Sequence, residues 1–244
     1  MPVWLDHASI LVPDLTAAVD HLDRRLGLRA TVSPAAPTRH SRVHLHRSYL
    51  EVSAGSRDGR WHPTMFFLRF DDPDALRAHL ETTSIEYRWS EYQGVDGTWD
   101  DVELRIGAVP LPTLIRRTAP SDVARDWPPA LGEPHRCGAR TLAAVHVEVP
   151  SVGEALEAYG RLLGRQPERP VRGPAHVSLV TGEVVLHEDR GGRISGIVLG
   201  VSSLDQTRDA LRAPLVETRD GVAWTDPEGV FGVRLGFAEV ALAG

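Results

Sequence analysis

One sequence pattern occurs four times along the chain and constrains the fold more than any other feature. In its first copy, the apolar run of residues 5–12 leads into Asp14 and a helical stretch that ends at Gly27. Asp side chains accept backbone N–H groups at helix N-termini, and Gly adopts the left-handed conformation that often closes a helix. The pattern therefore predicts a strand and then a helix, with Asp14 as N-cap and Gly27 as C-cap.

The other three copies repeat this order of elements. Apolar runs over residues 65–70, 143–149 and 196–201 each precede a polar cap and a helical stretch. Alternating segments follow the helices and predict three strands, which in the first copy cover residues 30–33, 41–46 and 49–53. Each copy is thus predicted to form a βαβββ module, and the fold class is α+β.

The segment between the second and third copies has a different character. Residues 119–140 show little hydrophobic periodicity and are rich in proline, which is typical of a linker. We therefore expect an N-terminal module pair over residues 1–120, a linker over 121–140 and a C-terminal pair over 141–244. In the fourth copy, the Asp-Pro-Glu-Gly sequence of residues 226–229 predicts a turn between the last two strands.

Composition excludes several functions. All 27 basic residues are arginines, so a pyridoxal phosphate Schiff base and a P-loop nucleotide site, which need lysine, are excluded. A net charge of −6 without a basic tract argues against nucleic-acid and anionic-membrane partners.

No apolar run approaches the roughly 18 residues of a membrane span, and no signal peptide is recognisable, so we expect a cytoplasmic protein. The single cysteine, Cys137, forms no internal disulfide and is expected to be an unreactive linker residue. The expected partner is a small molecule.

The repeated modules resemble a known superfamily. His7 in the first strand, Val-Pro-Asp-Leu at residues 12–15 and Tyr-Leu-Glu-Val at residues 49–52 are similar to the vicinal oxygen chelate superfamily, and within it to the glyoxalase-like domain group. The resemblance covers nearly the whole chain, including residues 133–139 of the linker. It implies two tandem curled-sheet barrels of the glyoxalase and dioxygenase type. Because that superfamily contains isomerases, epimerases, dioxygenases, thiol transferases and metal-free drug-binding proteins, the resemblance specifies the fold and leaves the reaction open.

Strand alternation predicts which side chains line the inside of the first barrel, because successive side chains point to opposite faces. Ala8, Ile10 and Val12 suit the helix side of the first strand, and the apolar residues of the third and fourth strands do the same. The inward residues are then His7, Ser9 and Leu11 in the first strand, Arg42, His44 and His46 in the third with His40 on the same parity just outside it, and Tyr49, Glu51 and Ser53 in the fourth.

The resemblance also implies a divalent metal held by one ligand from the first strand and one from the fourth strand of each module. Carried over, the ligands are His7 and Glu51, a set that suits Fe, Mn, Co, Ni or Zn. The second module has Met65 at the position of His7 and no acidic ligand in its last strand, so His40 or His44 is expected to complete the site. The alternative is that the histidines are solvated and that Glu51 pairs with Arg42 or Arg116.

The second module pair departs further from this ligand pattern. Ala144 and Gly196 occupy the positions that correspond to His7, which indicates that this half has lost the metal site. His146 and Glu148 still have inward parity, and His187 or Glu188 is able to meet them in a rearranged site.

Cationic and apolar side chains point to an organic ligand. Arg69, with whichever of Arg116 and Arg117 faces inward, suits a carboxylate, phosphate or enolate; the alternative is pairing with Asp101 or Glu103. Met65 and Phe67 add an apolar wall, with Trp89 and Tyr92 nearby. The expected substrate-binding residues are Arg42, Tyr49, Met65, Phe67, Arg69 and Arg116.

Two functions from different classes follow. In the first, the chain is a metal-dependent lyase, isomerase or dioxygenase with a site in the N-terminal barrel, where His7 and Glu51 are the catalytic residues and Glu51 holds the metal or acts as general base. In the second, it is a metal-free protein that binds and sequesters a small molecule. A homodimer is compatible with both.

Overall fold

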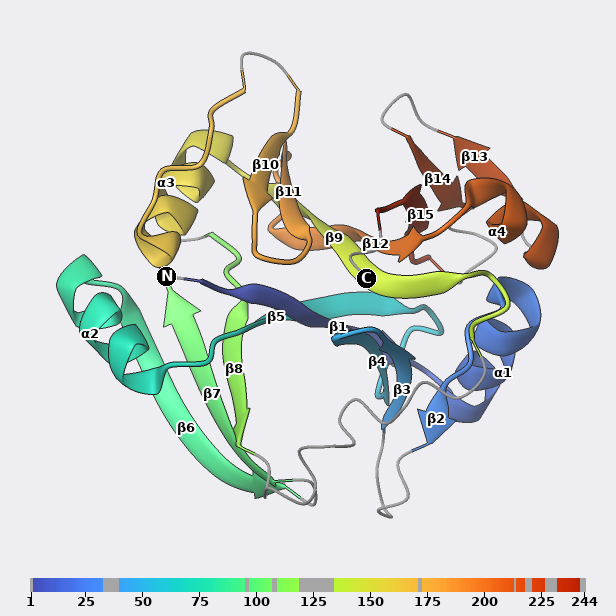
Figure 1. Cartoon of the computed structure of the whole chain (residues 1–244), viewed down its shortest axis with the longest axis horizontal. Helices are drawn as coiled ribbons and strands as arrows, with labels where there is room; N and C mark the ends of the chain where they lie inside the picture. The colour runs from blue at the N-terminus through green and yellow to red at the C-terminus, as the bar shows by residue number, and fades with distance from the viewer. Residues whose placement is uncertain are drawn as a thin grey trace. The chain divides into compact units, whose positions relative to one another are not determined.

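The computed structural model describes residues 2–32, 40–94, 97–106, 109–118, 134–170, 173–212, 214–217, 221–226 and 232–241. Within these ranges the chain forms four successive modules, each opening with a strand and a helix (Figure 1). Module one contains β1 (Trp4–Val12), α1 (Leu15–Leu26), β2 (Thr31–Val32), β3 (His40–Leu45) and β4 (Ser48–Ala54). Module two contains β5 (His62–Arg69), α2 (Pro73–Thr83), β6 (Glu86–Gly94), β7 (Gly97–Arg105) and β8 (Thr113–Thr118).

The second half of the chain has the same order with one exception. Module three contains β9 (Ala139–Val149), α3 (Val152–Leu163), β10 (Ala175–Ser178) and β11 (Glu183–Glu188). Module four contains β12 (Arg193–Val201), α4 (Leu204–Ala210), β13 (Leu215–Glu217), β14 (Val222–Thr225) and β15 (Leu235–Glu239). Module three therefore has two strands after its helix among the described residues, where three were predicted. Pro167 and Pro170 lie where the first of them would run, and proline has no N–H to donate to a sheet.

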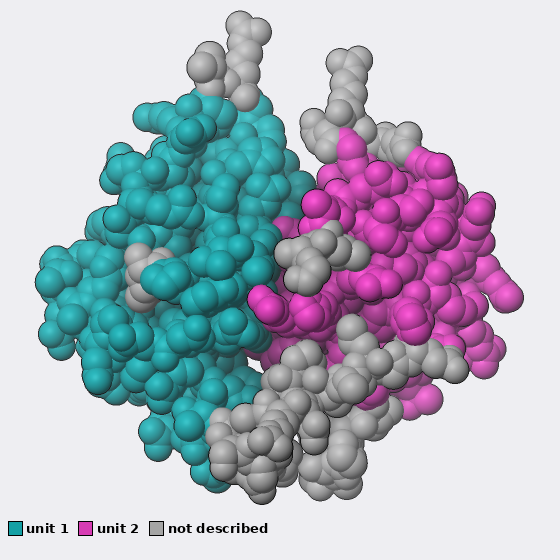
Figure 2. Space-filling model, in the orientation of Figure 1, with its two compact units in different colours: residues 1–6, 65–127, 144–194 teal, residues 7–64, 128–143, 195–244 magenta. Residues whose placement is uncertain are grey.

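Modules one and two contribute to one mixed sheet and modules three and four to another, so the predicted α+β fold of two tandem curled sheets is confirmed. By contacts between residues, the chain divides into two compact units (Figure 2). Unit 1 contains residues 1–6, 65–127 and 144–194, and unit 2 contains residues 7–64, 128–143 and 195–244. Each unit thus takes a module from each half of the chain. The domain boundaries predicted from the sequence stay a prediction.

The helix caps follow the sequence closely. The Asp14 side chain accepts a hydrogen bond from the Ala17 N–H at 3.0 Å, and Gly27 closes α1 with φ 64°. Ser151 and Gly164 do the same for α3. These capped helices fix where each first strand ends, and therefore which residues of that strand are inward.

In unit 2, the strands of module one run in the order β2-β3-β4-β1, and those of module four in the order β12-β15-β14-β13. One face of the module-one strands packs against α1. Ala8, Ile10, Val12, Leu50 and Val52 have no exposed surface, as the strand alternation predicts. On the other side of this contact, α1 buries Ala18, Leu22 and Leu26. This core leaves the opposite face of the same strands for other contacts.

In unit 1, module two has the strand order β5-β8-β7-β6 and module three the order β10-β11-β9. The helices α2 and α3 meet at a defined point, where the His79 Nε2 atom donates to the Leu162 carbonyl at 2.9 Å. In unit 2, the backbone N–H of Arg212 donates in a similar way to the carbonyl of Arg25, at the end of α1, at 2.9 Å.

The described end of the predicted linker belongs to unit 2. His135 is buried, its Nε2 atom donates to the His44 carbonyl at 2.7 Å, and its Nδ1 atom accepts from the Arg29 N–H. Cys137 is fully buried, and burial raises the pKa of its thiol to about 11, so the thiol is a poor nucleophile, as expected. Most of the linker, residues 119–133, and most of the predicted turn at 226–229 lie outside the described residues.

None of the described helices is both long enough and apolar enough to span a membrane.

Candidate functional site

The face of module one opposite α1 carries polar side chains at nearly every position. Cross-strand partners share a face, and the register pairs His44, Tyr49 and His7 in one row, Arg42, Glu51 and Ser9 in the next, and His40, Ser53 and Leu11 in a third. We call these nine residues of β3, β4 and β1 the polar face. Eight of the nine inward positions predicted in these strands are correct in this arrangement, together with His40. The prediction for His46 is wrong, because β3 ends at Leu45 and His46 is an exposed turn residue.

The first row of the polar face is its buried end. His7, Tyr49 and His44 are 3%, 5% and 7% exposed, which is low for polar groups. The rings of His7 and Tyr49 stack with centroids 4.2 Å apart and planes within 12°. The His44 Nε2 atom lies 2.8 Å from the Thr31 hydroxyl. Burial, with the positive charge of Arg42 and with His135 as smaller causes, lowers the pKa of His44 to about 4, so this imidazole is neutral at pH 7.

The second row is partly exposed and carries the charges. The Glu51 carboxylate accepts hydrogen bonds from the hydroxyls of Ser9 at 3.3 Å and Ser53 at 3.4 Å. Arg42 is the cross-strand partner of Glu51, and its guanidinium carbon lies 5.1 Å from the centre of the Tyr49 ring. This contact is a cation–π interaction. The Glu51 carboxylate and the Arg42 guanidinium thus belong to cross-strand partners, and the guanidinium lies over the Tyr49 ring.

The corresponding face of module two carries an aromatic cluster. Phe67, Trp99 and Ile115 form a buried cluster on the face away from α2, and Tyr92 stacks on Trp99 with ring planes within 6°. Arg117 lies over the Trp99 ring at 5.7 Å. Trp99 was missed by the sequence reasoning, although its alternation with Asp101 was the available signal. We call Phe67, Tyr92, Trp99, Ile115 and Arg117 the aromatic face.

The two arginines of β8, Arg116 and Arg117, lie on opposite faces of the sheet. Arg116 points to the α2 side, where its Nε atom donates to the buried Asp100 carboxylate at 2.9 Å. The Trp89 indole N–H donates to the same carboxylate at 2.9 Å. The expected alternative, pairing of the inward arginines with Asp101 or Glu103, therefore does not concern Arg116, whose partner is Asp100. The inward arginine of β8 is Arg117.

The other expected residues of β5 are spread along the strand. Met65 is 46% exposed. Arg69 has the same parity as Phe67, lies over the Trp4 ring at 5.0 Å and forms an ion pair with Asp71 at 3.4 Å. Both residues belong to unit 1, and their role in binding a substrate stays a prediction.

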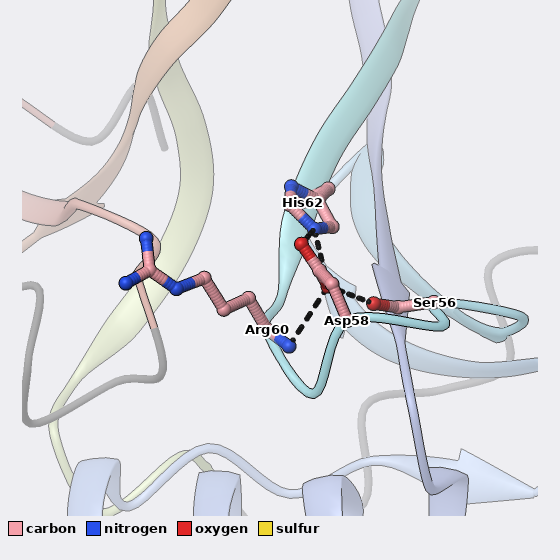
Figure 3. A network of polar contacts seen from close by, with 4 residues as sticks. All are labelled: Ser56, Asp58, Arg60 and His62. Atoms are coloured by element: carbon pink, nitrogen blue, oxygen red, sulfur yellow. Dashed lines mark hydrogen bonds and ion pairs between the residues drawn. The ribbon is translucent and has the colours of Figure 1, made fainter.

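The loop between β4 and β5, together with the first residue of β5, carries a compact polar cluster (Figure 3). The Asp58 carboxylate accepts from His62 Nε2 at 2.8 Å, from the Arg60 backbone N–H at 3.0 Å and from the Ser56 hydroxyl at 2.8 Å. These hydrogen bonds, that of His62 most of all, hold the pKa of Asp58 far below its usual range. Because Ser56 donates to the carboxylate and not to the imidazole, the cluster orders the loop and is not arranged as a nucleophile with its base.

The donor set of the polar face does not fit the three-ligand metal site that the resemblance implies. His7 stacks on Tyr49 one row away from Glu51, and His44 is bonded to Thr31. Across the part of the chain that the structure describes, no three His, Cys, Asp or Glu side chains come together as a group that could hold a metal ion.

Comparison with known proteins agrees with this architecture. A family model for a glyoxalase-like domain matches residues 5–163. No curated protein matches the chain. Among solved structures, a hypothetical protein from Staphylococcus aureus has 9% identity and a TM-score of 0.69, with 98% of this chain and all of that chain covered.

Two dioxygenases are also similar in fold. The 2,3-dioxygenase LapB from Pseudomonas sp. KL28 has 15% identity and a TM-score of 0.69 over 98% of this chain and 92% of its own. An extradiol ring-cleaving dioxygenase from B. fuscum has 14% identity and a TM-score of 0.64 over 97% and 71%. At these identities the likeness concerns the fold alone. The family match covers most of the chain, so the protein belongs to the glyoxalase-like domain family of the vicinal oxygen chelate superfamily.

Proposed function

We propose that the protein binds a small, oxygen-rich organic molecule on the polar face of module one. The observation that supports this proposal is the second row, where Glu51 and Arg42 are cross-strand partners and both are partly exposed. The Glu51 carboxylate is able to accept hydrogen bonds from hydroxyl groups of a ligand, and the Arg42 guanidinium is able to donate hydrogen bonds to its carbonyl or carboxylate. Ligands with neighbouring oxygens, such as hydroxy acids and vicinal diols, match both groups at once.

The buried first row gives such a ligand a shaped floor. The stacked His7 and Tyr49 rings lie beneath Arg42, and the neutral His44 adds no charge that would repel Arg42. The Ser9 and Ser53 hydroxyls hold the Glu51 carboxylate in one orientation. A carboxylate that is already oriented loses less conformational freedom when a ligand binds.

The direct test is a screen of hydroxy acids, diols and dicarbonyl compounds by thermal shift, followed by calorimetry on the hits. We expect Glu51→Gln to weaken the best hit at least tenfold, because a hydrogen bond to a charged group contributes about 1.5–3 kcal/mol. Asp58→Asn is the matched control, since it removes a carboxylate outside the polar face. A ligand that binds wild type, Glu51→Gln and Arg42→Gln equally would show that its site lies elsewhere.

The second candidate is a metal-dependent lyase, isomerase or dioxygenase, with His7 and Glu51 as its catalytic residues. It is favoured by one observation, namely that His7 and Glu51 lie on one face of neighbouring strands. Elemental mass spectrometry on tag-free protein tests it. Near-stoichiometric Fe, Mn, Co, Ni or Zn that is lost in both His7→Ala and Glu51→Ala would favour the enzyme. Protein that stays empty after reconstitution would leave metal-free binding.

A further inference from the structure

The strand β6 differs from the other strands that end a sheet. It is the last strand of the eight-stranded sheet and contains nine residues, Glu86–Gly94 (Figure 1). The strands at the other three sheet ends, β2, β10 and β13, contain two, four and three residues in the part of the chain that the structure describes. Short edge strands offer few backbone groups to a second chain, and proteins use them to avoid pairing at a sheet edge. The edge at β6 is long, so it does not have this protection.

The strand β6 is also regular along its whole length. Its register with β7 runs without interruption from the Glu86–Arg105 pair to the Gly94–Gly97 pair, so it contains no bulge, and its sequence contains no proline. Bulges and prolines are two further means by which proteins block an edge. Alternate residues of an edge strand direct their N–H and C=O groups away from the sheet, where another strand is able to pair with them. The edge of β6 is therefore a template for one more strand.

We propose that two copies of the chain associate through β6, which pairs antiparallel with β6 of the second copy about a two-fold axis. Addition of a strand to a sheet edge is a recurring mode of recognition, and two-fold dimers are the most common symmetric assemblies. The axis is perpendicular to the joined sheet, so each face of one sheet continues into the same face of the other. Residues that oppose each other then have the same parity, and the centre of the pairing falls on a residue.

The charges and the length of β6 select Ser90 as that central residue. A centre at Arg88 or at Glu91 would place that side chain directly opposite its own copy, and like charges in this position are destabilising. A centre at Trp89 would leave the last two residues of the strand without a partner, and centres nearer to either end would pair fewer residues still. With Ser90 at the centre, all residues of Glu86–Gly94 pair, because the first residue opposes the last residue of the second copy.

In this register each charged side chain of β6 opposes an uncharged residue. Glu91 opposes Trp89 of the second copy on the α2 side, and on the other face Arg88 opposes Tyr92 of the second copy. The Arg88 side chain is 70% exposed and Tyr92 is 47% exposed, so a cation–π contact between them is accessible twice across the axis. Arg88 forms an ion pair with Glu103, but both side chains are exposed, and such pairs contribute little to stability. This complementarity of the strand with itself favours a second copy as the partner.

The proposed interface is separate from the polar face of module one. The strand β6 belongs to unit 1, whereas His7 and Glu51 belong to unit 2. Association through β6 requires no ligand on the polar face, so the proposal does not depend on the proposed function.

The first test is sedimentation equilibrium of the tag-free full chain from micromolar to near-millimolar concentration. We expect a monomer–dimer equilibrium in the wild type. Ser90→Arg places two guanidinium groups opposite each other at the axis, so association should weaken by about tenfold or more. Ser178→Arg is the matched control and should associate as the wild type does, because Ser178 is an exposed serine on the short edge strand β10. Circular dichroism checks that the variants are folded.

Cysteine cross-linking tests the register. Ser90→Cys should form a disulfide-linked dimer on oxidation, because the two introduced residues oppose each other with Cα atoms within the roughly 7 Å that a disulfide spans. Glu86→Cys is the control on the same strand, since its two copies would lie eight positions apart along the pairing, about 27 Å at a rise of about 3.4 Å per residue. The native Cys137 is fully buried and is not expected to react.

Three results would each overturn the proposal. The wild type would stay monomeric at every concentration, Ser90→Arg would associate as strongly as the wild type, or Glu86→Cys would cross-link as readily as Ser90→Cys. The first result would mean that the edge of β6 does not pair with a second copy. The other two would mean that any dimer forms through another surface or in another register.

Discussion

The inward faces of modules one and two are built on equivalent strands and differ in their central residues. The polar face carries His7, Glu51 and Arg42 in hydrogen-bonded rows, while the aromatic face is centred on the stacked rings of Trp99 and Tyr92. In both modules the opposite face packs apolar side chains against a helix, with fully buried Leu50 in module one and Leu68 in module two. The helix side thus preserves the fold, and the inward side is free to differ.

This difference predicts how each face contributes to stability. Aromatic side chains contribute by burying area, so their removal leaves a cavity. Buried polar groups contribute little net free energy when they are satisfied, but they make stability depend on protonation. Substitutions on the aromatic face should therefore change stability at every pH, and those on the polar face should change its pH dependence.

The largest expected effect is that of Trp99→Ala on the aromatic face. Trp99 is 6% exposed and contacts Phe67, Ile115, Tyr92 and Arg117. Its truncation should lower the free energy of unfolding by about 3–5 kcal/mol, as for other large buried aromatics. Urea denaturation followed by circular dichroism measures the change. Tyr92→Ala is the control, because Tyr92 is 47% exposed and its loss should cost under about 1 kcal/mol. Equal losses in both variants would mean that the cluster is not a buried core.

The next largest effect concerns the polar face and pH. In the folded chain the pKa of His44 is about 4, against 6.5 for an unperturbed imidazole. A depressed pKa means that the folded state disfavours the protonated ring. The neutral His44 ring therefore contributes fully to the stability of the folded chain above pH 6.5, and this contribution is lost as the pH falls from 6.5 towards 4. We expect a loss on the order of 2 kcal/mol over this window.

Measuring the free energy of unfolding between pH 7.5 and 4 in wild type and His44→Gln tests this expectation. Glutamine has no proton to gain, so the variant should show a flatter profile across the window. Burial also lowers the pKa of His135, so part of the slope is expected to remain in the variant. Identical profiles for the two proteins would contradict the assignment of the slope to His44.

The sequence predicted the features that depend on local alternation. Asp14 and Gly27 as caps, and the inward parity of His7, Glu51 and Arg42, follow from a period of two along a strand and from capping preferences within a few residues. These features involve no partner far away in the chain. They are therefore visible in one segment at a time.

What the sequence left open depends on register between distant strands. It offered His187 and Glu188 as alternatives to meet His146, and the parallel alignment of β9 with β11, some forty residues later, brings His187 to His146. A shift of one residue would turn one of the two rings to the α3 side. The same holds for module two, where the pairing of Asp100 with Arg116 decides which arginine of β8 faces the helix. Alternation alone left Arg116 and Arg117 equivalent.

The smallest expected effect on stability distinguishes Arg116 from Arg117. Arg116 donates to Asp100, which is 6% exposed. Arg116→Gln therefore removes the cation from a buried carboxylate that also accepts the Trp89 indole N–H. The loss in unfolding free energy should be about 1–2 kcal/mol, because a buried charge that loses a partner bears the cost of its desolvation. Arg117→Gln should cost under about 0.5 kcal/mol, since Arg117 is partly exposed over an aromatic ring. Urea denaturation of the two single variants side by side measures both. If Arg117→Gln lowered the free energy of unfolding more than Arg116→Gln, Arg117 would be the structural arginine of β8, and the assignment of that role to Arg116 would be wrong.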